Sequence, residues 1–428
     1  MKLQLRDYQK ELAYKGKEIL KRHNILYLSM EVRTGKTATA LEVVRQSGFK
    51  KVLFLTKKKA IQSIINDYHS FDFHYYFKLT VTNNESMHKV EGDFDCVIHD
   101  ESHRFGSFPK PSEGAKYFMK HFYKLPLILL SGTPTPESYS QIYHQLWVSM
   151  YSPFNQWKSF YKWAVDFVDV KDRHLGYAVV KDYSNAKREK IMPYIEPLML
   201  TYSQQEAGFN TTIQEHVLYC PIKDTTLNLI KRLNKDKFIQ GKNEEIIADT
   251  AVKLMQKTHQ MYSGTVKFES GNSKVLDTSK AEFILNQFKN RKIAIFYKFK
   301  AELEALKMVF SELLTDDLEE FNNSDKSFAV QIVSGREGIS LKAAEFLVYY
   351  NIDFSATSYW QSRDRLTTMD RLTNDVYWVF TRGGIEEKIY QTVQNKADYT
   401  LSHFNKDYGI KVSDRGNGSV KAVGFSRS

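Results

Sequence analysis

Residues 95–104 read DCVIHDESHR, a short apolar run that ends in two adjacent acids, Asp100 and Glu101. The run 96–99 is typical of a buried strand, which would place both acids at its carboxyl end. In an open parallel sheet, ligands bind at that edge. One carboxylate there can reach a divalent cation while its neighbour orients and deprotonates a water molecule. A solvated strand end would have the same composition, so the rest of the chain must decide between the two interpretations.

Similar apolar runs recur through the first 150 residues and alternate with helical patterns. The runs are continuously apolar rather than alternating, which indicates parallel strands covered by helices on both faces. The predicted strands are 25–30, 51–56, 95–99 and 127–131, and the predicted helices are 7–22, 37–46, 60–69, 114–122 and 140–147. This order predicts an α/β domain in residues 1–150.

A second series with the same alternation begins near residue 274. Its predicted strands are 292–297, 329–334, 346–351 and 376–381, and its predicted helices are 281–288, 300–314, 359–366 and 385–404. We therefore expect a second α/β domain over residues 274–412, with a cleft between the two domains. Residues 151–273 are aromatic-rich and then amphipathic, which predicts a mostly helical connecting region, and residues 413–428 are expected to form a disordered tail.

Composition limits the class of protein. The chain has 428 residues, of which 42% are apolar and 26% charged, as in ordinary globular proteins. It has two cysteines and no CxxC pair, which argues against a disulfide framework or a zinc site. No apolar run approaches the ~20 residues that span a membrane, and no secretory signal is present, so we expect a cytoplasmic location. The net charge of +11 indicates a polyanionic partner.

Upstream of the acid pair, the apolar run 25–30 leads into EVRTGKT at residues 31–37 and then into a predicted helix. This strand–loop–helix context is typical of a phosphate-binding loop. Gly35 lets the backbone wrap closely, Lys36 reaches the β- and γ-phosphates, and Thr37 offers a hydroxyl to Mg²⁺. The strict pattern has a glycine five residues before Gly35, where this chain has Met30. Together with the acids downstream, the loop favours a nucleotide site.

These segments, taken in order, resemble the motifs of superfamily 2 helicases and translocases, closest to the Swi/Snf-like and phage recombination branches. EVRTGKT resembles motif I and DESH, at residues 100–103, resembles the DExH form of motif II. The other similar segments are LRDYQ at 5–9, SGTP at 131–134, the stretch 195–207, SGREGISL at 334–341 and QSRDR at 361–365. The resemblance implies two RecA-like domains with a nucleotide cleft between them.

The resemblance also implies roles for single residues around ATP and Mg²⁺. The implied nucleotide-binding residues are Arg6, Gln9, Arg33, Thr34, Gly35, Lys36, Thr37 and Gly338. Arg33 stands where many relatives have glycine. Thr37 and Asp100 would hold the metal. The implied catalytic residues are Lys36, Glu101, Gln361, the arginine finger Arg365, and Arg371.

Arg371 is the less direct of these assignments, because the second arginine of motif VI would fall on Thr368; Arg363 is the other choice. Ser131, Thr133 and His103 are expected to couple the nucleotide state to the bound strand.

Lys57, Lys58 and Lys59 come directly after the predicted strand 51–56, where relatives contact a nucleic-acid backbone. A lysine cluster supplies phosphate contacts without reading sequence, although a solvated charge run has the same composition. The resemblance implies an ATP-dependent helicase or translocase that acts on DNA in replication, recombination or repair. Two alternatives remain open: an RNA-directed DExH helicase, and a nucleic-acid-binding module that ATP switches without net translocation.

Overall fold

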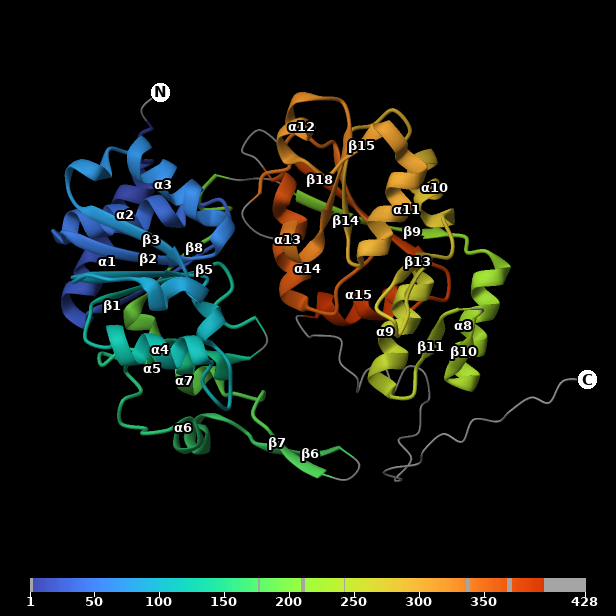
Figure 1. Ribbon diagram of the computed structural model, residues 1–428. Coiled ribbons are helices and arrows are strands. Elements are labelled where there is room, and N and C mark those ends of the chain that lie inside the picture. The colour runs from blue at the N-terminus through green and yellow to red at the C-terminus, as the bar shows by residue number, and fades with distance from the viewer. Residues whose placement is uncertain are drawn as a thin grey trace, which may run out of the picture.

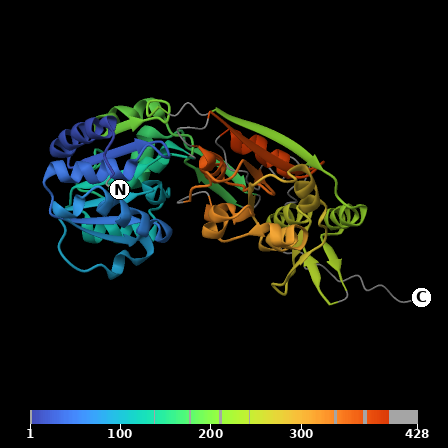
Figure 2. The same ribbon diagram turned by 90° about the horizontal axis from the view of Figure 1, so that it is seen from above.

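The computed structural model describes residues 3–136, 138–175, 178–208, 212–241, 243–335, 339–367 and 372–395. Two lobes lie side by side, one built from the first half of the chain and the other from the second (Figures 1 and 2). Each lobe contains one six-stranded sheet. Within the described ranges, no helix combines the length and the apolar character needed to cross a membrane.

The sheet of the first lobe is parallel throughout, with the order β3-β2-β4-β5-β1-β8. Its strands are β1 (Ile25–Met30), β2 (Lys51–Thr56), β3 (Lys78–Asn83), β4 (Cys96–Asp100), β5 (Leu127–Ser131) and β8 (Met199–Tyr202). The four predicted apolar runs of this lobe are confirmed as strands. Their side chains are buried on both faces because helices cover both, as continuous apolarity requires.

The helices of the first lobe form two layers, one on each face of the sheet. One layer is α1 (Asp7–His23), α2 (Lys36–Ser47) and α3 (Ile61–Ser70), which share a core with the even-numbered residues of β1. The other is α4 (Glu113–Phe122), α5 (Ile142–Trp147), α6 (Phe160–Phe167) and α7 (Arg188–Ile195), which pack on the opposite face. A hairpin of β6 (Lys171–Leu175) and β7 (Ala178–Asp182) extends away from this layer (Figure 1).

The sheet of the second lobe is also parallel, with the order β15-β16-β14-β17-β18-β9. Its strands are β9 (Thr212–Cys220), β14 (Ile293–Tyr297), β15 (Leu314–Thr315), β16 (Ser327–Gln331), β17 (Phe346–Tyr349) and β18 (Thr373–Thr381). The predicted strand 329–334 is wrong at its end, because the strand stops at Gln331 and a helical turn begins at Ile332.

Helices again cover both faces of this second sheet. They are α8 (Asp224–Asp236), α9 (Ala251–Tyr262), α10 (Ser279–Gln287), α11 (Lys300–Phe310), α12 (Leu318–Asn323), α13 (Ile332–Gly335), α14 (Ala356–Ser362) and α15 (Glu386–Gln394). Two small antiparallel pairs are added, β10 (Phe238–Gln240) with β11 (Glu245–Ile247), and β12 (Thr265–Lys267) with β13 (Ser273–Val275). The predicted tail and the last part of the predicted helix 385–404 lie outside the described residues.

The sequence predicts a mostly helical connecting region over residues 151–273, and in the structure this stretch contributes elements to both lobes. Strand β8 closes the first sheet and β9 closes the second, so the region is divided between the lobes. In α6, the ring of Phe160 packs 6.0 Å from Phe108 and 5.6 Å from Tyr143, measured between ring centroids. Phe160 and Trp163, two aromatic residues of this stretch, are therefore part of the core of the first lobe. We propose that the boundary between the domains lies between β8 and β9.

This division predicts a large difference between two residues of α6. Phe160 is buried, whereas Val165 is 79% exposed. Phe160→Ala is expected to cost about 3–5 kcal/mol of stability, because it leaves a cavity against Phe108 and Tyr143. Val165→Ala, on the same helix, should change stability by less than about 0.5 kcal/mol. Urea unfolding followed by circular dichroism measures both, and equal losses would contradict the assignment of α6 to the first lobe.

Candidate functional site

Three neighbouring strands at the centre of the first sheet, β4, β5 and β1, end at the same edge. The loop after β1 leads into α2, β4 ends in the acid pair, and β5 ends at Ser131. This edge is where an open parallel sheet binds ligands. The structure therefore brings together residues 31–37, 100–103 and 131–134, which are far apart in the sequence.

The loop before α2 has the geometry of a close-wrapping turn. Gly35 has φ +81°, and a Cβ atom there would lie 2.1 Å from Gln9 Nε2. Lys36 is the first residue of α2, and its Nζ donates a hydrogen bond of 3.0 Å to the carbonyl oxygen of Met30. Burial lowers the pKa of Lys36, although the carboxylates of Glu101 and Asp100 oppose that shift. The first-turn amide groups of α2 have no partner within the helix, so the loop is suited to bind an anion.

Residues at the start of α1 pack against this loop and form a hydrogen bond with it. Gln9 Oε1 accepts a 2.9 Å hydrogen bond from the Arg6 amide at the beginning of α1. The Tyr8 ring stacks on Tyr202 at 4.7 Å, and its hydroxyl donates to the carbonyl oxygen of Thr34 at 2.9 Å. The start of α1 thus both opens a helix and packs on the loop. Sequence reasoning did not assign Tyr202, because only the pairing of β8 with β1 places it there.

The acid pair has two different environments. Thr56 Oγ1 donates a 2.8 Å hydrogen bond to Asp100 Oδ2. Burial, reinforced by the neighbouring charge of Glu101, raises the pKa of Asp100 from 3.8 to about 6. Burial also opposes ionisation of Glu101, but His103, Lys57 and Lys36 outweigh it and lower the pKa of that carboxyl. At neutral pH Glu101 is therefore the more firmly ionised of the two.

Polar contacts link the acid pair to the end of β5. The Nδ1 atom of His103 lies 3.3 Å from Glu101 Oε2 and 3.3 Å from Ser131 Oγ. The Ser131 hydroxyl oxygen in turn accepts a 3.1 Å hydrogen bond from the amide of Thr133. His103, Ser131 and Thr133, which the sequence suggested as coupling residues, thus form a continuous path from Glu101.

A second buried network runs behind this path and was not anticipated from the sequence. The Tyr27 hydroxyl lies 2.7 Å from Ser102 Oγ and donates to Gln145 Oε1 at 2.7 Å. Gln145 Nε2 donates to the carbonyl oxygen of Pro134, also at 2.7 Å. A buried hydroxyl in an apolar strand needs a partner, so Tyr27 carried a signal, but nothing in the sequence indicated Gln145.

The second lobe faces these groups with α14 and the turn η8 (Arg363–Leu366). Arg365 Nε donates a 3.1 Å hydrogen bond to the carbonyl oxygen of Gln361. Arg363 donates to Glu215 Oε1 at 3.3 Å and lies 3.9 Å from the Trp360 ring, so contacts within its own lobe hold it. Gly338, Thr368 and Arg371 lie outside the described residues.

Two cavities lie between the lobes, and Lys36, Glu101 and Arg365 line both. The smaller cavity, of about 610 Å³, is also lined by Thr37 and Asp100. Gln361 and Thr133 line the larger, of about 830 Å³. Thr133 Oγ1 and Gln361 Oε1 are buried and lack a hydrogen-bond partner within the described part of the chain. Orphaned oxygens of this kind fit a polar ligand with its metal and water.

Two predicted groups have surroundings that the sequence did not suggest. Lys57, Lys58 and Lys59 line the smaller cavity together with Thr37 and Asp100, rather than a separate surface. Arg33, expected to contact the nucleotide, donates to the backbone of the second lobe at Arg365 and Thr367.

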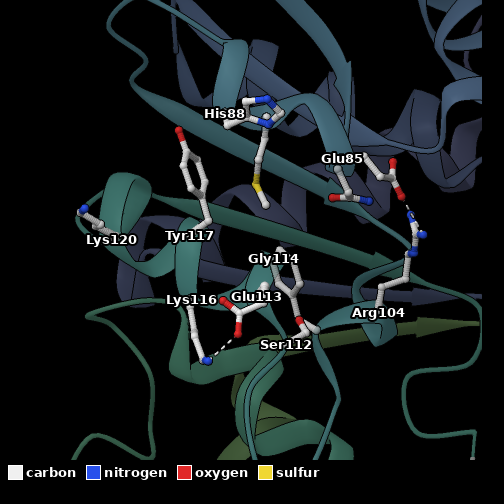
Figure 3. A pocket seen from close by; sticks show the side chains of 12 residues that line it. Glu85, His88, Arg104, Ser112, Glu113, Gly114, Lys116, Tyr117 and Lys120 are labelled. Carbon is white, nitrogen blue, oxygen red and sulfur yellow. Dashed lines mark hydrogen bonds and ion pairs between the residues drawn. The ribbon is translucent and has the colours of Figure 1, made fainter.

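A third cavity, of about 660 Å³, lies beside the site between η3 (Asn84–Lys89) and α4 (Figure 3). Arg104 and Glu85 form a 3.0 Å ion pair at one side, and Lys116 and Glu113 form one of 2.6 Å at another (Figure 3). Arg104 and Glu85 also line the smaller inter-lobe cavity. None of the residues predicted from the sequence lines this third cavity, and two of its charged pairs are satisfied within its own wall.

Comparison with known proteins adds little to this geometry. No family model matches the chain, and no curated protein matches it in sequence. Among solved structures, the chain is similar to a SWI2/SNF2 ATPase core from Sulfolobus solfataricus in complex with double-stranded DNA, with a TM-score of 0.42. The two sequences are 14% identical, and the similarity covers 96% of each chain.

The raised pKa of Asp100 predicts a pH-dependent effect of Asp100→Asn in metal-free protein. The pKa of Asp100 in the folded state lies above its unfolded value, so the folded protein favours the protonated carboxyl group. The stability that the protonated Asp100 contributes is fully present below pH 3.8 and is lost as the pH rises through about 6. Compared with wild type, the variant should be about equally stable at pH 4 and more stable by about 2–3 kcal/mol at pH 7.5.

Urea unfolding across this pH range measures the difference. Asp93→Asn, at an exposed position, provides the control and should differ from wild type by less than about 0.5 kcal/mol throughout. A constant offset for Asp100→Asn would contradict the raised pKa.

Proposed function

We propose that this protein is an ATP-dependent nucleic-acid motor that hydrolyses ATP between its two lobes. One observation carries the proposal: Lys36 and Glu101 of the first lobe line the same cavities as Arg365 of the second. A phosphate loop alone would support nucleotide binding. An arginine supplied by the other lobe makes hydrolysis depend on how the lobes meet, which can convert the reaction into motion.

The residues present suit the parts of phosphoryl transfer. The amide groups at the start of α2 and the Lys36 ammonium group bind the phosphates of ATP. The Thr37 hydroxyl and the Asp100 carboxylate are oxygen donors of the type that Mg²⁺ prefers, and the ion would neutralise charge on the phosphates. The hydrogen bond from Thr56 supports this role, because it orients the Asp100 carboxyl group.

Glu101 and Arg365 complete the reaction. Glu101 orients the attacking water and accepts its proton, while the water oxygen bonds to the γ-phosphorus and the bond to the ADP oxygen breaks. The Arg365 guanidinium stabilises the charge on the transferred group. His103, in contact with both Glu101 and Ser131, is placed to transmit the state of this site toward Thr133.

DNA is the partner that we propose, in replication, recombination or repair. The support is the net charge of +11 together with the three lysines after β2, which face a cavity between the lobes. Lysine contacts to a phosphate backbone do not read sequence, so binding should be non-specific and weakened by salt. Steady-state ATPase with single-stranded, duplex and forked DNA and with RNA tests this choice. If neither DNA nor RNA raises turnover at low salt, the motor proposal fails.

Two variants separate nucleotide binding from hydrolysis. Glu101→Gln should bind a fluorescent ATP analogue as wild type does but hydrolyse ATP about 10²–10⁴-fold more slowly, because it cannot accept the proton. Arg365→Ala should also retain binding and lose about 10³–10⁵-fold in turnover. Glu113→Gln, at an exposed position of α4, is the matched control and should leave turnover unchanged. Near-normal stimulated turnover in Glu101→Gln would place the hydrolytic site elsewhere.

Replacing the lysine cluster tests whether it binds the phosphates of DNA or those of ATP. Replacing Lys57, Lys58 and Lys59 by alanine should reduce the slope of log Kd against log salt for duplex DNA by about 2–3, one contact being worth about 0.9. DNA affinity should fall more than ATP affinity, because we assign these lysines chiefly to the nucleic acid although they line the same cavity as Thr37 and Asp100.

The control for this experiment replaces Lys10, Lys15 and Lys21, which are exposed on α1 and carry the same total charge. An unchanged slope combined with weakened ATP binding would mean that the cluster serves the nucleotide instead.

A further inference from the structure

Arg33 lies in a backbone conformation that does not suit its side chain. Its φ is +65°, in the left-handed region that glycine adopts without cost and that other residues adopt rarely. Two residues later, Gly35 also has a positive φ of +81°. An arginine at such a position is informative because its conformational cost must be offset by interactions of its side chain.

Those interactions cross between the lobes. Arg33 Nη2 donates a 2.5 Å hydrogen bond to the carbonyl oxygen of Arg365, and Arg33 Nη1 donates to the carbonyl oxygen of Thr367. The partners lie 332 and 334 positions away along the chain. The two nitrogens of one planar guanidinium group thus contact two nearby carbonyl groups from fixed positions, whereas a lysine ammonium would have to serve both from a single atom.

The segment that Arg33 contacts is itself well anchored in the second lobe. Leu366 and Thr367 are buried, and Asn374 of β18 donates a 2.9 Å hydrogen bond to Thr367 Oγ1. The carbonyl oxygen of Arg365 also accepts from the amide of Leu341 at 3.2 Å. Arg33 therefore holds the phosphate loop to a fixed part of the second lobe.

The Arg365 side chain starts from this same segment and lines both inter-lobe cavities with Lys36 and Glu101. Its Nε donates to the Gln361 carbonyl oxygen, which orients the guanidinium from within the second lobe. The contact of Arg33 with the Arg365 backbone adds a constraint from the first lobe. Contacts with both lobes therefore fix the position of the Arg365 segment relative to the phosphate loop that carries Lys36.

We propose that Arg33 is a positioning residue that holds the Arg365 segment against the phosphate loop and so sets the distance at which Arg365 meets the nucleotide. The role of Arg365 in this statement rests on the proposed function. The contact between the lobes does not, since it is made by the backbone of residues 365 and 367 and needs no nucleotide.

A distance measurement tests the contact independently of activity. Both native cysteines are buried, so cysteines introduced at the exposed positions Tyr14 and Met308 can be spin-labelled selectively. Pulsed electron paramagnetic resonance of nucleotide-free protein should give a narrow inter-lobe distance distribution for wild type. Arg33→Gly, which fits the left-handed backbone, should broaden it, and Arg33→Lys should lie between the two. Arg22→Ala, an exposed arginine on α1, controls for the loss of charge.

Kinetics test the positioning role. Arg33→Gly should lower kcat about 10- to 100-fold, a part of the value of an arginine finger, while ATP affinity stays within about twofold. In an Arg365→Ala background, Arg33→Gly should cause no further loss, because both residues act through the same guanidinium group. Equal melting temperatures of the variants would exclude a general loss of folding as the cause.

The outcomes separate the two proposals. An unchanged distance distribution in Arg33→Gly would overturn the inter-lobe contact, whatever the activity. A broadened distribution with additive kinetic losses, or with weakened ATP binding, would show that Arg33 acts on the nucleotide and would overturn the positioning role. A wild-type protein without stimulated ATPase activity would refute the proposed function while the distance measurement still decided the contact.

Discussion

The partial burial of two adjacent carboxylates at the end of β4 is the constraint on which the rest of the site depends. Asp100 and Glu101 repel each other in a low-dielectric environment, and burial penalises both charges. The protein offsets this cost with Lys36 after β1, Lys57 after β2 and Arg365 of the second lobe, and with the His103 ring, whose Nδ1 lies 3.3 Å from Glu101 Oε2. Because one of these comes from the other lobe, the electrostatics of the acid pair depend on how the lobes meet.

The two lobes contribute different things to this arrangement. The first supplies a complete set of polar groups at one sheet edge, supported by the Tyr27–Gln145 network behind it. The second supplies an arginine and a buried glutamine on a short helix and turn. Arg33 connects the two sets through backbone carbonyl groups. A path of contacts from Glu101 through His103 to Thr133 leads away from the site within the first lobe. The site is therefore formed by residues from both lobes, which come from distant parts of the chain.

Sequence reasoning predicted the central strands well, because short, continuous apolar runs such as 51–56 are typical of strands that are buried on both faces. It did not assign the elements of residues 151–273 to the two sheets, because neither the aromatic residues nor the amphipathic helices of this stretch have a sequence pattern that indicates which lobe they cover. Strand β9 lies at the edge of its sheet, where most of its side chains are half-buried or exposed, and it was not recognised as a strand. The lysines after β2 were predicted correctly as a cluster at a strand end, but the cavity that they line could not be read from a linear pattern.

The sequence by itself determined two α/β lobes and the residue types that meet at the end of β4. Neighbouring parallel strands all end at one edge of the sheet, so the loops that follow them lie close together there. Only the tertiary structure decided the partners of those residues. The different pKa values of Asp100 and Glu101 depend on charges that the fold brings from distant segments. The direction of the Arg33 side chain depends on a carbonyl group 332 positions away. Hydrogen bonds and burial act over a few ångströms in space, and distance along the chain does not report that proximity.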